Sequence, residues 1–225
     1  MRLVLARHGE TRWNADGRFQ GRSASPLSAL GRRQARRLAR ACRRYAPTAL
    51  YTSPLPRARE TAAYLADALG LEAHPLEALQ EAHLGELEGL TAQEVRARYP
   101  EVAAAWRRDP GAVTLPGGGE SLGQLQERVW GAVQGLGARH GDETVVAVSH
   151  NFAIRAVVCR VLGLPLSRFR TLQVDLASLT VVEVEGDGGR LLLLNDRCHL
   201  EGPSAFSSQP SGGGGQGQPR PASGG

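Results

Sequence analysis

The sequence predicts an α/β fold, a three-layer sandwich in which a mostly parallel central sheet with an antiparallel edge lies between helices. Short apolar runs typical of buried strands alternate with segments of helical periodicity along most of the chain. Two further strand-like runs then flank Gly186-Asp187-Gly188-Gly189, a strong hairpin signal. The 225 residues are 41% hydrophobic, which is enough for one substantial core. We therefore expect one folded domain over residues 1–201.

The first predicted elements are two buried strands with a helix between them. Residues 3–6 form a compact apolar run, which is typical of a strand covered on both faces. Ser28 can cap a helix that runs to about Tyr45, and Pro47 ends that helix. Residues 48–52 are then predicted to form the second buried strand.

The middle of the chain continues the alternation of helix and strand. Ser53-Pro54 predicts an N-cap followed by proline at the first helical position, and Gly70 is a natural stop for that helix. Residues 71–74 could form a short third strand. Residues 91–94, Thr-Ala-Gln-Glu, are a capping box that opens a short helix ending before Pro100.

The last third of the chain predicts a long helix, a buried strand, a second helix and a hairpin. Ser121 with Gln124 opens the long helix, which reaches about residue 139. Residues 144–149 are the clearest buried strand, and an apolar helix follows it. Residues 178–184 and 190–195 form the hairpin, which would supply the antiparallel edge of the sheet.

Residues 202–225 differ in composition from the rest of the chain. Serine, glycine, proline and glutamine dominate there. Such a segment cannot bury enough apolar surface to offset the entropy lost on ordering. We therefore expect a disordered tail after the folded domain.

The basic residues of the chain are concentrated in one predicted helix. The formal net charge is +5, and all 27 basic residues are arginines. Seven of them lie between Ser28 and Tyr45, namely Arg32, Arg33, Arg36, Arg37, Arg40, Arg43 and Arg44. A solvated helix face explains this pattern, and the aromatic residues that would stack on bases are missing from it. We therefore expect no nucleic-acid partner.

Other bulk features favour a soluble cytoplasmic protein with no membrane partner. No apolar run is long enough to span a bilayer, and the N-terminus leads directly into a strand. The three cysteines, Cys42, Cys159 and Cys198, are widely spaced and odd in number. We therefore expect reduced thiols, with neither a disulfide framework nor a metal site.

Polar residues follow four of the predicted strands at the point where each strand ends. Arg7 and His8 follow the first strand, Arg57 opens the helix after the second, Glu81 follows the third, and His150 follows residues 144–149. The carboxyl ends of parallel strands share one edge of a sheet, where open α/β folds bind ligands. Guanidinium groups and imidazoles at one edge predict a pocket for an anion, most plausibly a phosphate.

The ordered set of motifs around these residues resembles the histidine phosphatase superfamily, also called the phosphoglycerate mutase-like family. The resemblance extends from Arg2 to about Asn195. The matching motifs are Arg7-His8-Gly9-Glu10-Thr11 with Asn14, Phe19-Gln20-Gly21, Pro26-Leu27-Ser28, Ser53-Pro54-Leu55 with Arg57, Glu81 with Gly85, Gly118-Gly119-Glu120-Ser121, and Ser149-His150. The family's fold agrees with the sandwich expected from the pattern of strands and helices.

The resemblance implies a phosphatase that works through a phosphohistidine. His8 would attack phosphorus, with its other ring nitrogen held by a backbone carbonyl. Arg7, Arg57 and His150 would stabilise charge on the transferring phosphoryl group. Glu81 would protonate the leaving alkoxide and then activate water. Glu10 and Glu120 are alternatives for that last role.

The resemblance also implies which residues contact the substrate and what kind of molecule the protein binds. Substrate contacts are expected from Thr11, Asn14, Gln20, Gly21 and Asn151. The partner would be a small phosphorylated metabolite, bound by a monomer or a homodimer. No metal and no cofactor are needed, because arginines supply the positive charge.

Three other functions remain open at the level of sequence. A cofactor-dependent phosphoglycerate mutase uses the same residues, but the family's mutases carry a longer insertion after the glutamate motif. Here the segment 81–120 is short. A mutase needs extra basic residues for a second acidic group, and the pair in this segment that best fits that need is Arg107-Arg108. An α-ribazole phosphatase also fits this length and motif set. A non-catalytic phosphate-binding protein is the remote alternative, since such a protein would usually have lost His8 or Glu81.

Overall fold

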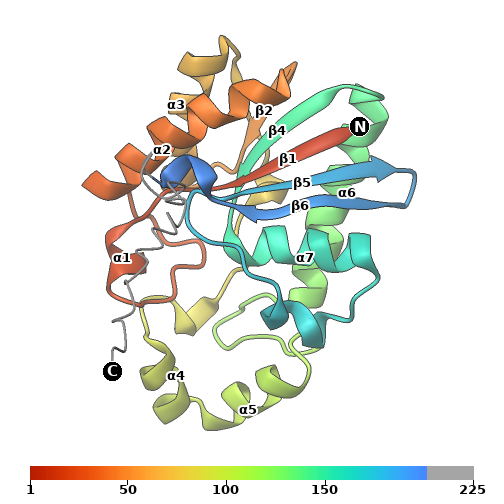
Figure 1. Ribbon diagram of the computed structural model, residues 1–225. Helices are drawn as coiled ribbons and strands as arrows, with labels where there is room; N and C mark the ends of the chain where they lie inside the picture. The colour runs from red at the N-terminus through yellow and green to blue at the C-terminus, as the bar shows by residue number, and fades with distance from the viewer. Residues whose placement is uncertain (202–225) are drawn as a thin grey trace, which may run out of the picture.

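The computed structural model describes residues 1–201, which form a six-stranded mixed sheet with helices on both sides (Figure 1). The strands are β1 (Arg2–Arg7), β2 (Ala49–Thr52), β3 (Ala73–Pro75), β4 (Thr144–Ser149), β5 (Leu179–Glu185) and β6 (Gly188–Asp196). They lie in the order β3-β2-β4-β1-β5-β6. Strands β1 to β4 are parallel, while β5 pairs antiparallel with β1 and β6 pairs antiparallel with β5. The predicted sandwich with an antiparallel edge is therefore confirmed.

Helices of different lengths connect and cover the strands. The α-helices are α1 (Arg12–Ala15), α2 (Ala29–Cys42), α3 (Pro56–Leu69), α4 (Ala92–Arg98), α5 (Pro100–Arg108), α6 (Leu122–His140) and α7 (Asn151–Leu162). Short 3₁₀ turns are η1 (Arg43–Tyr45), η2 (Glu77–Leu79), η3 (Gly85–Leu87), η4 (Leu166–Thr171) and η5 (Cys198–Leu200).

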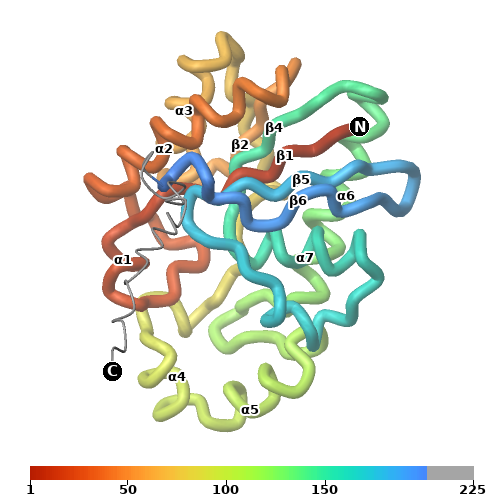
Figure 2. Tube along the Cα trace, viewed as in Figure 1, coloured from red at the N-terminus to blue at the C-terminus, as the bar shows by residue number. Residues whose placement is uncertain are grey.

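Alternate residues of the central strands bury two separate cores. Leu5 of β1 packs on one face, in a cluster that includes Leu125 of α6 and Ile154 of α7. Val4 packs on the other face, in a cluster that includes Leu38 of α2 and residues of α3. Figure 2 shows these two pairs of helices on opposite sides of the sheet. Fully burying one such leucine contributes roughly 1.5–3 kcal/mol, so both layers fix the position of β1.

The register of β1 and β4 places two predicted site residues side by side. Arg7, the last residue of β1, is paired with Ser149, the last residue of β4. His8 and His150 therefore leave the sheet together at its carboxyl edge. The backbone N–H of His8 donates to the Ser149 carbonyl at 3.1 Å, which extends the ladder by one bond.

The start of α3 differs from the sequence prediction. The helix begins at Pro56, with Leu55 as its N-cap, and not after Ser53-Pro54. The residue that precedes a proline avoids the helical region, and Leu55 is accordingly extended, with φ −64° and ψ 138°. Ser53 is free of the capping role, and its hydroxyl binds His150 instead. Arg57 still lies in the first turn, as predicted.

Other boundaries are close to the predictions, with three differences. Helix α5 is not expected from the sequence, because a proline can end a helix or stand at its first position, and here Pro100 begins α5. Strand β3 begins at Ala73 and not at Leu71. The hairpin turn is shorter than the four residues expected, since β6 already begins at Gly188. The predicted disordered tail, residues 202–225, lies outside the described residues.

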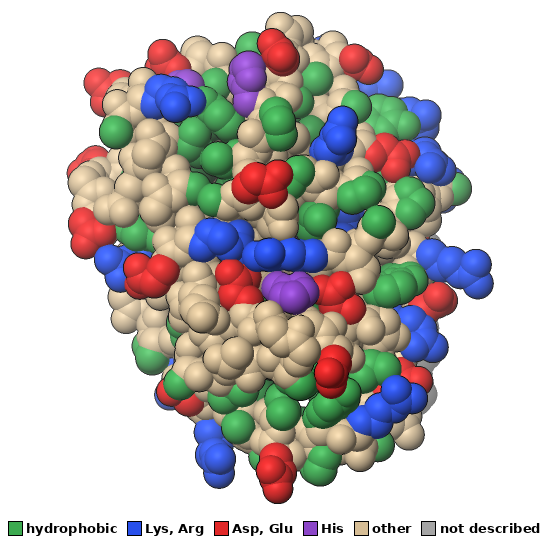
Figure 3. Space-filling view, turned by 180° about the vertical axis from the view of Figure 1, so that it is seen from behind, with side chains coloured by type: hydrophobic (Ala, Val, Ile, Leu, Met, Phe, Trp, Pro, Cys, Tyr) green, Lys and Arg blue, Asp and Glu red, His purple; other side chains and the backbone are tan. Residues whose placement is uncertain are grey.

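The arginines of α2 and η1 lie on the surface, as expected for a helix face exposed to solvent. All seven arginines between Arg32 and Arg44 are exposed. Figure 3 shows the face opposite to that of Figure 1, where basic and acidic side chains are interspersed. Within residues 1–201, no helix is both long and apolar enough to cross a membrane.

Candidate active site

His8 lies at the end of β1 with both ring nitrogens engaged. Its Nδ1 is 2.7 Å from the Gly9 carbonyl oxygen, and the Arg57 Nε–H donates to its Nε2 at 3.2 Å. Nε2 therefore accepts, and Nδ1 carries the proton that it donates to the carbonyl. The hydrogen bond from Nδ1 to a backbone carbonyl is the one expected from the sequence, and it leaves the lone pair on Nε2, which becomes the nucleophile once the Arg57 hydrogen bond is released.

The surroundings of His8 keep its imidazole neutral. Burial lowers the pKa of His8 well below its ordinary value of 6.5, and the charges of Arg57 and Arg7 lower it further. The hydrogen bond to Gly9 acts in the opposite direction, but it is a smaller effect. A neutral imidazole is the form that can attack phosphorus.

Arg57 joins the nucleophile to the loop that follows α1. Its Nη2 donates to the Gly21 carbonyl at 2.7 Å, and its Nη1 donates to the Ser23 carbonyl at 3.0 Å. The side chain is only 1% exposed. Burial lowers the pKa of Arg57 to about 10, which still leaves the guanidinium charged at neutral pH.

Arg7 supplies a second buried guanidinium. Its Nη1 donates to the Val174 carbonyl at 2.7 Å. Among residues 1–201, the buried Nε of Arg7 has no hydrogen-bond partner. Burial lowers the pKa of Arg7 to about 10, so this group is also cationic at neutral pH. Arg7 thus offers a fixed charge and an unused donor to an anion.

His150 packs directly against His8. The two ring centroids are 5.1 Å apart. The Nε2 of His150 is 2.7 Å from the Ser53 hydroxyl, while its buried Nδ1 has no partner in the described part of the chain. Burial lowers the pKa of His150 well below 6.5, and the charge of Arg57 is the next largest cause.

Glu81 approaches the same site from the loop after β3. Its carboxyl oxygens accept hydrogen bonds from the backbone amides of Ala82, Phe152 and Ala153, at 3.0–3.2 Å. Two of these amides belong to the first turn of α7, where free N–H groups point out of the helix. The carboxyl group of Glu81 is therefore held at the N-terminus of α7.

Arg128 fixes the segment that carries Glu81, a role that no motif or spacing in the sequence indicates. Its Nη1 donates to the carbonyls of Ala78 at 2.7 Å and Gln80 at 3.2 Å. Its Nε and Nη2 donate to the Glu120 carboxylate at 2.9 and 2.8 Å. Arg128 lies on α6, distant in sequence from these carbonyls, so only the tertiary structure brings them together.

Eight of the predicted site residues form the wall of one cavity of about 210 Å³. They are Arg7, His8, Asn14, Gln20, Gly21, Arg57, Glu81 and Asn151. The side-chain oxygens of Gln20 and Asn151 are buried and have no partner among residues 1–201. The cavity therefore combines a nucleophile, two guanidinium groups, a carboxyl group and polar amides.

Two predicted site residues lie outside the wall of this cavity. Thr11 is buried and caps α1, where its hydroxyl exchanges hydrogen bonds with Asn14. It therefore positions Asn14 and does not face the cavity. His150 is wholly buried against His8 and contributes no wall surface in the described residues.

The alternative carboxylates are engaged elsewhere. The Ser28 hydroxyl donates to Glu10 at 2.7 Å, and Glu120 is paired with Arg128 at 2.8 Å. The loop that carries Glu10 also touches α2 closely, since a Cβ at Gly31 would lie 2.1 Å from the Glu10 carbonyl oxygen.

Among residues 1–201, no three His, Cys, Asp or Glu side chains are grouped so that they could hold a metal ion.

Comparisons with known proteins agree with this geometry. A family model described as the histidine phosphatase superfamily (branch 1) matches residues 3–197. Phosphoserine phosphatase 1 of Hydrogenobacter thermophilus is 38% identical over 200 residues, which cover 89% of this chain and 94% of that protein. Glucosyl-3-phosphoglycerate phosphatase of Mycolicibacterium vanbaalenii is 38% identical over 178 residues, covering 76% and 78%.

A solved structure shows the same fold. YhfR of Bacillus stearothermophilus superposes with a TM-score of 0.82 at 33% sequence identity. The match covers 89% of this chain and 99% of YhfR. The likeness thus extends over nearly all of the described residues.

Proposed function

Since this chain belongs to the histidine phosphatase superfamily, we propose that it hydrolyses a small phosphomonoester by way of a phosphoryl group carried on His8. The observation that supports this most is the state of the His8 ring. Its imidazole is neutral, its Nδ1–H is fixed to the Gly9 carbonyl, and its Nε2 lone pair lies beside the Arg57 guanidinium. Nucleophile and phosphate-binding cation are therefore in contact before substrate binds.

In the first step, Nε2 of His8 forms a bond to phosphorus as the ester P–O bond breaks. Glu81 in its acid form gives its proton to the leaving alkoxide. In the second step, the Glu81 carboxylate takes a proton from water, the water oxygen bonds to phosphorus, and the N–P bond breaks. Inorganic phosphate leaves, and Glu81 is again protonated. The amides of α7 keep the Glu81 carboxyl group in place through both steps.

Charge on the transferring group is stabilised by Arg7, Arg57 and His150. The two guanidinium groups face the cavity and remain charged at neutral pH. When the Ser53 hydroxyl donates to Nε2 of His150, the single proton of that neutral ring lies on Nδ1. This N–H has no other partner in the described residues, and because His150 does not line the cavity, the ring must shift toward it before the N–H can reach a phosphoryl oxygen.

Hydrolysis fits the site better than mutase chemistry. A mutase must bind a bisphosphorylated intermediate and keep water from the phosphohistidine. The segment after Glu81 contributes α4 and α5, and of their residues that line the neighbouring cavity only Arg96 and Arg107 are basic. Phosphoglycerate supplied with 2,3-bisphosphoglycerate should therefore lose its phosphate faster than it isomerises.

Hydrolysis of p-nitrophenyl phosphate in the presence of EDTA tests the proposal. We expect turnover by the native protein and none by His8→Ala. His74→Ala, at an exposed histidine outside the cavity, is the matched control and should retain full activity. Undiminished hydrolysis by His8→Ala would contradict the proposed nucleophile.

A further inference from the structure

A second, larger cavity adjoins the phosphate site. Its volume is about 600 Å³, within the range usual for ligand sites. Phe19, Leu84 and Phe152 line both this cavity and the smaller one that holds His8. The two cavities therefore lie side by side, and the leaving group of a phosphoester bound at His8 could extend toward the larger one.

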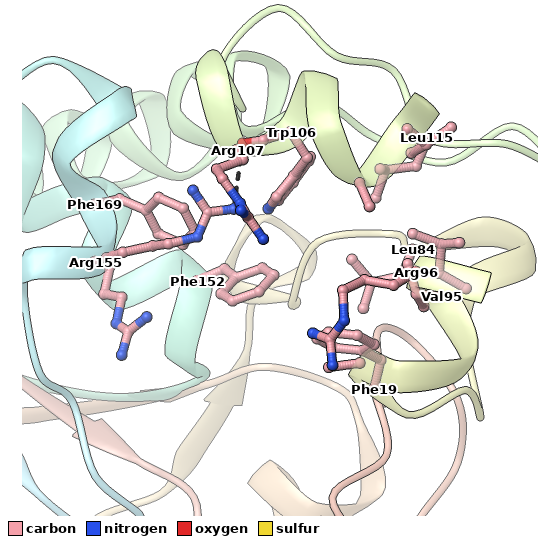
Figure 4. Close-up of a pocket in the computed structure, with 15 residues that line it drawn as sticks. Phe19, Leu84, Val95, Arg96, Trp106, Arg107, Leu115, Phe152, Arg155 and Phe169 are labelled. Carbon is pink, nitrogen blue, oxygen red and sulfur yellow. Dashed lines mark hydrogen bonds between the residues drawn. The ribbon is translucent and has the colours of Figure 1, made fainter. Parts of the chain in front are cut away.

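Aromatic side chains form one wall of the larger cavity. Trp106, Phe152 and Phe169 contact one another with ring centroids 5.5–6.4 Å apart, and Figure 4 shows them from α5, α7 and η4 around one side. Phe169 is buried, but Trp106 and Phe152 are only half-buried. A ligand that covered these two rings would gain about 25 cal/mol for each Å² of apolar surface removed from water.

Arginines without acidic partners surround this apolar wall. The cavity is lined by Arg96, Arg107, Arg155 and Arg170. Within residues 1–201, none of the four forms a salt bridge. Figure 4 shows Arg155 on the side of Phe152 and Phe169, and Arg96 on the opposite side beside Phe19. The cavity therefore combines apolar walls with four arginines that form no salt bridge in the described residues.

Arg155 is the best placed of these cations. Its guanidinium carbon lies 5.8 Å from the centroid of Phe169, and that of Arg170 lies 4.9 Å from the same centroid. The Nε of Arg155 is buried and has no hydrogen-bond partner in the described residues. Burial lowers the pKa of Arg155; the charges of Glu81 and Asp175 act in the opposite direction, and the smaller effect of Arg170 lowers it again. A bound anion would use the free Nε–H donor.

We propose that the substrate is a phosphomonoester whose leaving group is a ring-sized apolar moiety bearing a second anionic group, with the apolar part on Trp106 and Phe152 and the anion at Arg155. This proposal rests on the proposed function, because the phosphate must bind at His8. A small polar alcohol would leave the half-buried aromatic wall in contact with water. A purely apolar alcohol would leave the buried Nε–H of Arg155 without a partner.

Three esters of primary alcohols separate these contributions, because their leaving groups have similar intrinsic reactivity. They are ethyl phosphate, 3-phenylpropyl phosphate and 3-(4-carboxyphenyl)propyl phosphate. We expect kcat/KM to rise about 30-fold from the first to the second, for burial of the ring. We expect a further rise of about tenfold with the carboxylate, for a charge-assisted hydrogen bond.

Variants at matched arginines assign the second effect to a residue. Arg155→Met should abolish the preference for the carboxylated ester over 3-phenylpropyl phosphate. Arg59→Met, at an exposed arginine outside both cavities, should leave the preference unchanged. The ratio of the two kcat/KM values is the readout, so a general loss of activity in Arg155→Met does not affect it.

The outcomes distinguish this inference from the proposed function. If ethyl phosphate is hydrolysed in a His8-dependent way as fast as the two arylalkyl esters, the proposed function stands and this inference is wrong. A carboxylate preference that survives in Arg155→Met would overturn the assignment of the anion. If none of the three esters is hydrolysed although p-nitrophenyl phosphate is, this inference is wrong and the proposed function stands; if p-nitrophenyl phosphate is not hydrolysed either, both proposals fail.

Discussion

The two buried imidazoles should make the stability of the protein depend on pH. In the folded state, burial and nearby arginines lower the pKa of both His8 and His150 well below 6.5. In the unfolded chain both groups return to a pKa of about 6.5. Below that pH the unfolded chain therefore binds more protons than the folded protein, and stability must fall as the pH falls.

The magnitude follows from the number of protons involved. Stability is complete above pH 6.5 and declines as the pH approaches the folded-state pKa values. Each imidazole contributes a slope of up to about 1.4 kcal/mol per pH unit, so the two together contribute a slope of up to about 2.7 kcal/mol per pH unit. If both rings stay neutral in the folded protein, the loss between pH 8 and pH 5 is about 4 kcal/mol. This is a large part of the stability of an ordinary domain.

Urea unfolding at several values of pH between 5 and 8 measures this slope. The comparison is with the double variant His8→Gln/His150→Gln, which keeps a polar side chain at each position but cannot titrate. Other groups whose pKa is lowered on folding, such as His199 and Glu120, are common to both proteins and cancel in the difference. An equal dependence on pH in the wild-type protein and the double variant would refute the reasoning.

Three further changes test other parts of the site. Glu81→Gln should lower kcat for an alkyl ester such as ethyl phosphate, whose leaving alkoxide needs a proton, by roughly 10²- to 10⁴-fold, the usual contribution of a general acid–base group, and an unchanged kcat would contradict its role. Arg128→Met should reduce kcat while KM stays nearly constant, because Arg128 holds the segment of Glu81 and does not line the phosphate cavity; a change confined to KM would argue against positioning. Gly31→Ala should destabilise the protein by about 2 kcal/mol or more in urea unfolding, since its Cβ would meet the Glu10 carbonyl at 2.1 Å. Gly131→Ala, on an exposed helix position with nothing within 4 Å, is the control and should stabilise by up to about 1 kcal/mol.

The parts of the fold that depend on local patterns were predictable from sequence. Residues 145–148 are continuously apolar because β4 is buried on both faces, and Thr91 with Glu94 forms the capping box that their spacing indicates. The polar residues that follow the strands could be placed at one edge because parallel strands share a direction. That argument predicts that His8, Arg57 and Glu81 lie close together, and in the structure all three line one cavity.

The remaining features depend on contacts between distant segments. Arg128 reaches the carbonyls around Glu81 from another helix, and no spacing in the sequence marks that approach. The aromatic wall joins Trp106 and Phe169 across α5 and η4, although α5 itself was not predicted. The sequence offers two prolines, Pro54 and Pro56, for the first position of α3, and local patterns favour Pro54. The helix begins at Pro56 because Leu55 is extended.

The transfer of phosphate to His8 is the central claim, and the protein itself can be tested for it. The protein is mixed with a phosphomonoester carrying radiolabelled phosphate and quenched during turnover in alkaline detergent, and the label is located by peptide mapping. We predict label on the peptide that contains His8, which disappears when unlabelled substrate is added before the quench. Turnover with label on another residue, or with no label on the His8 peptide, would contradict the account.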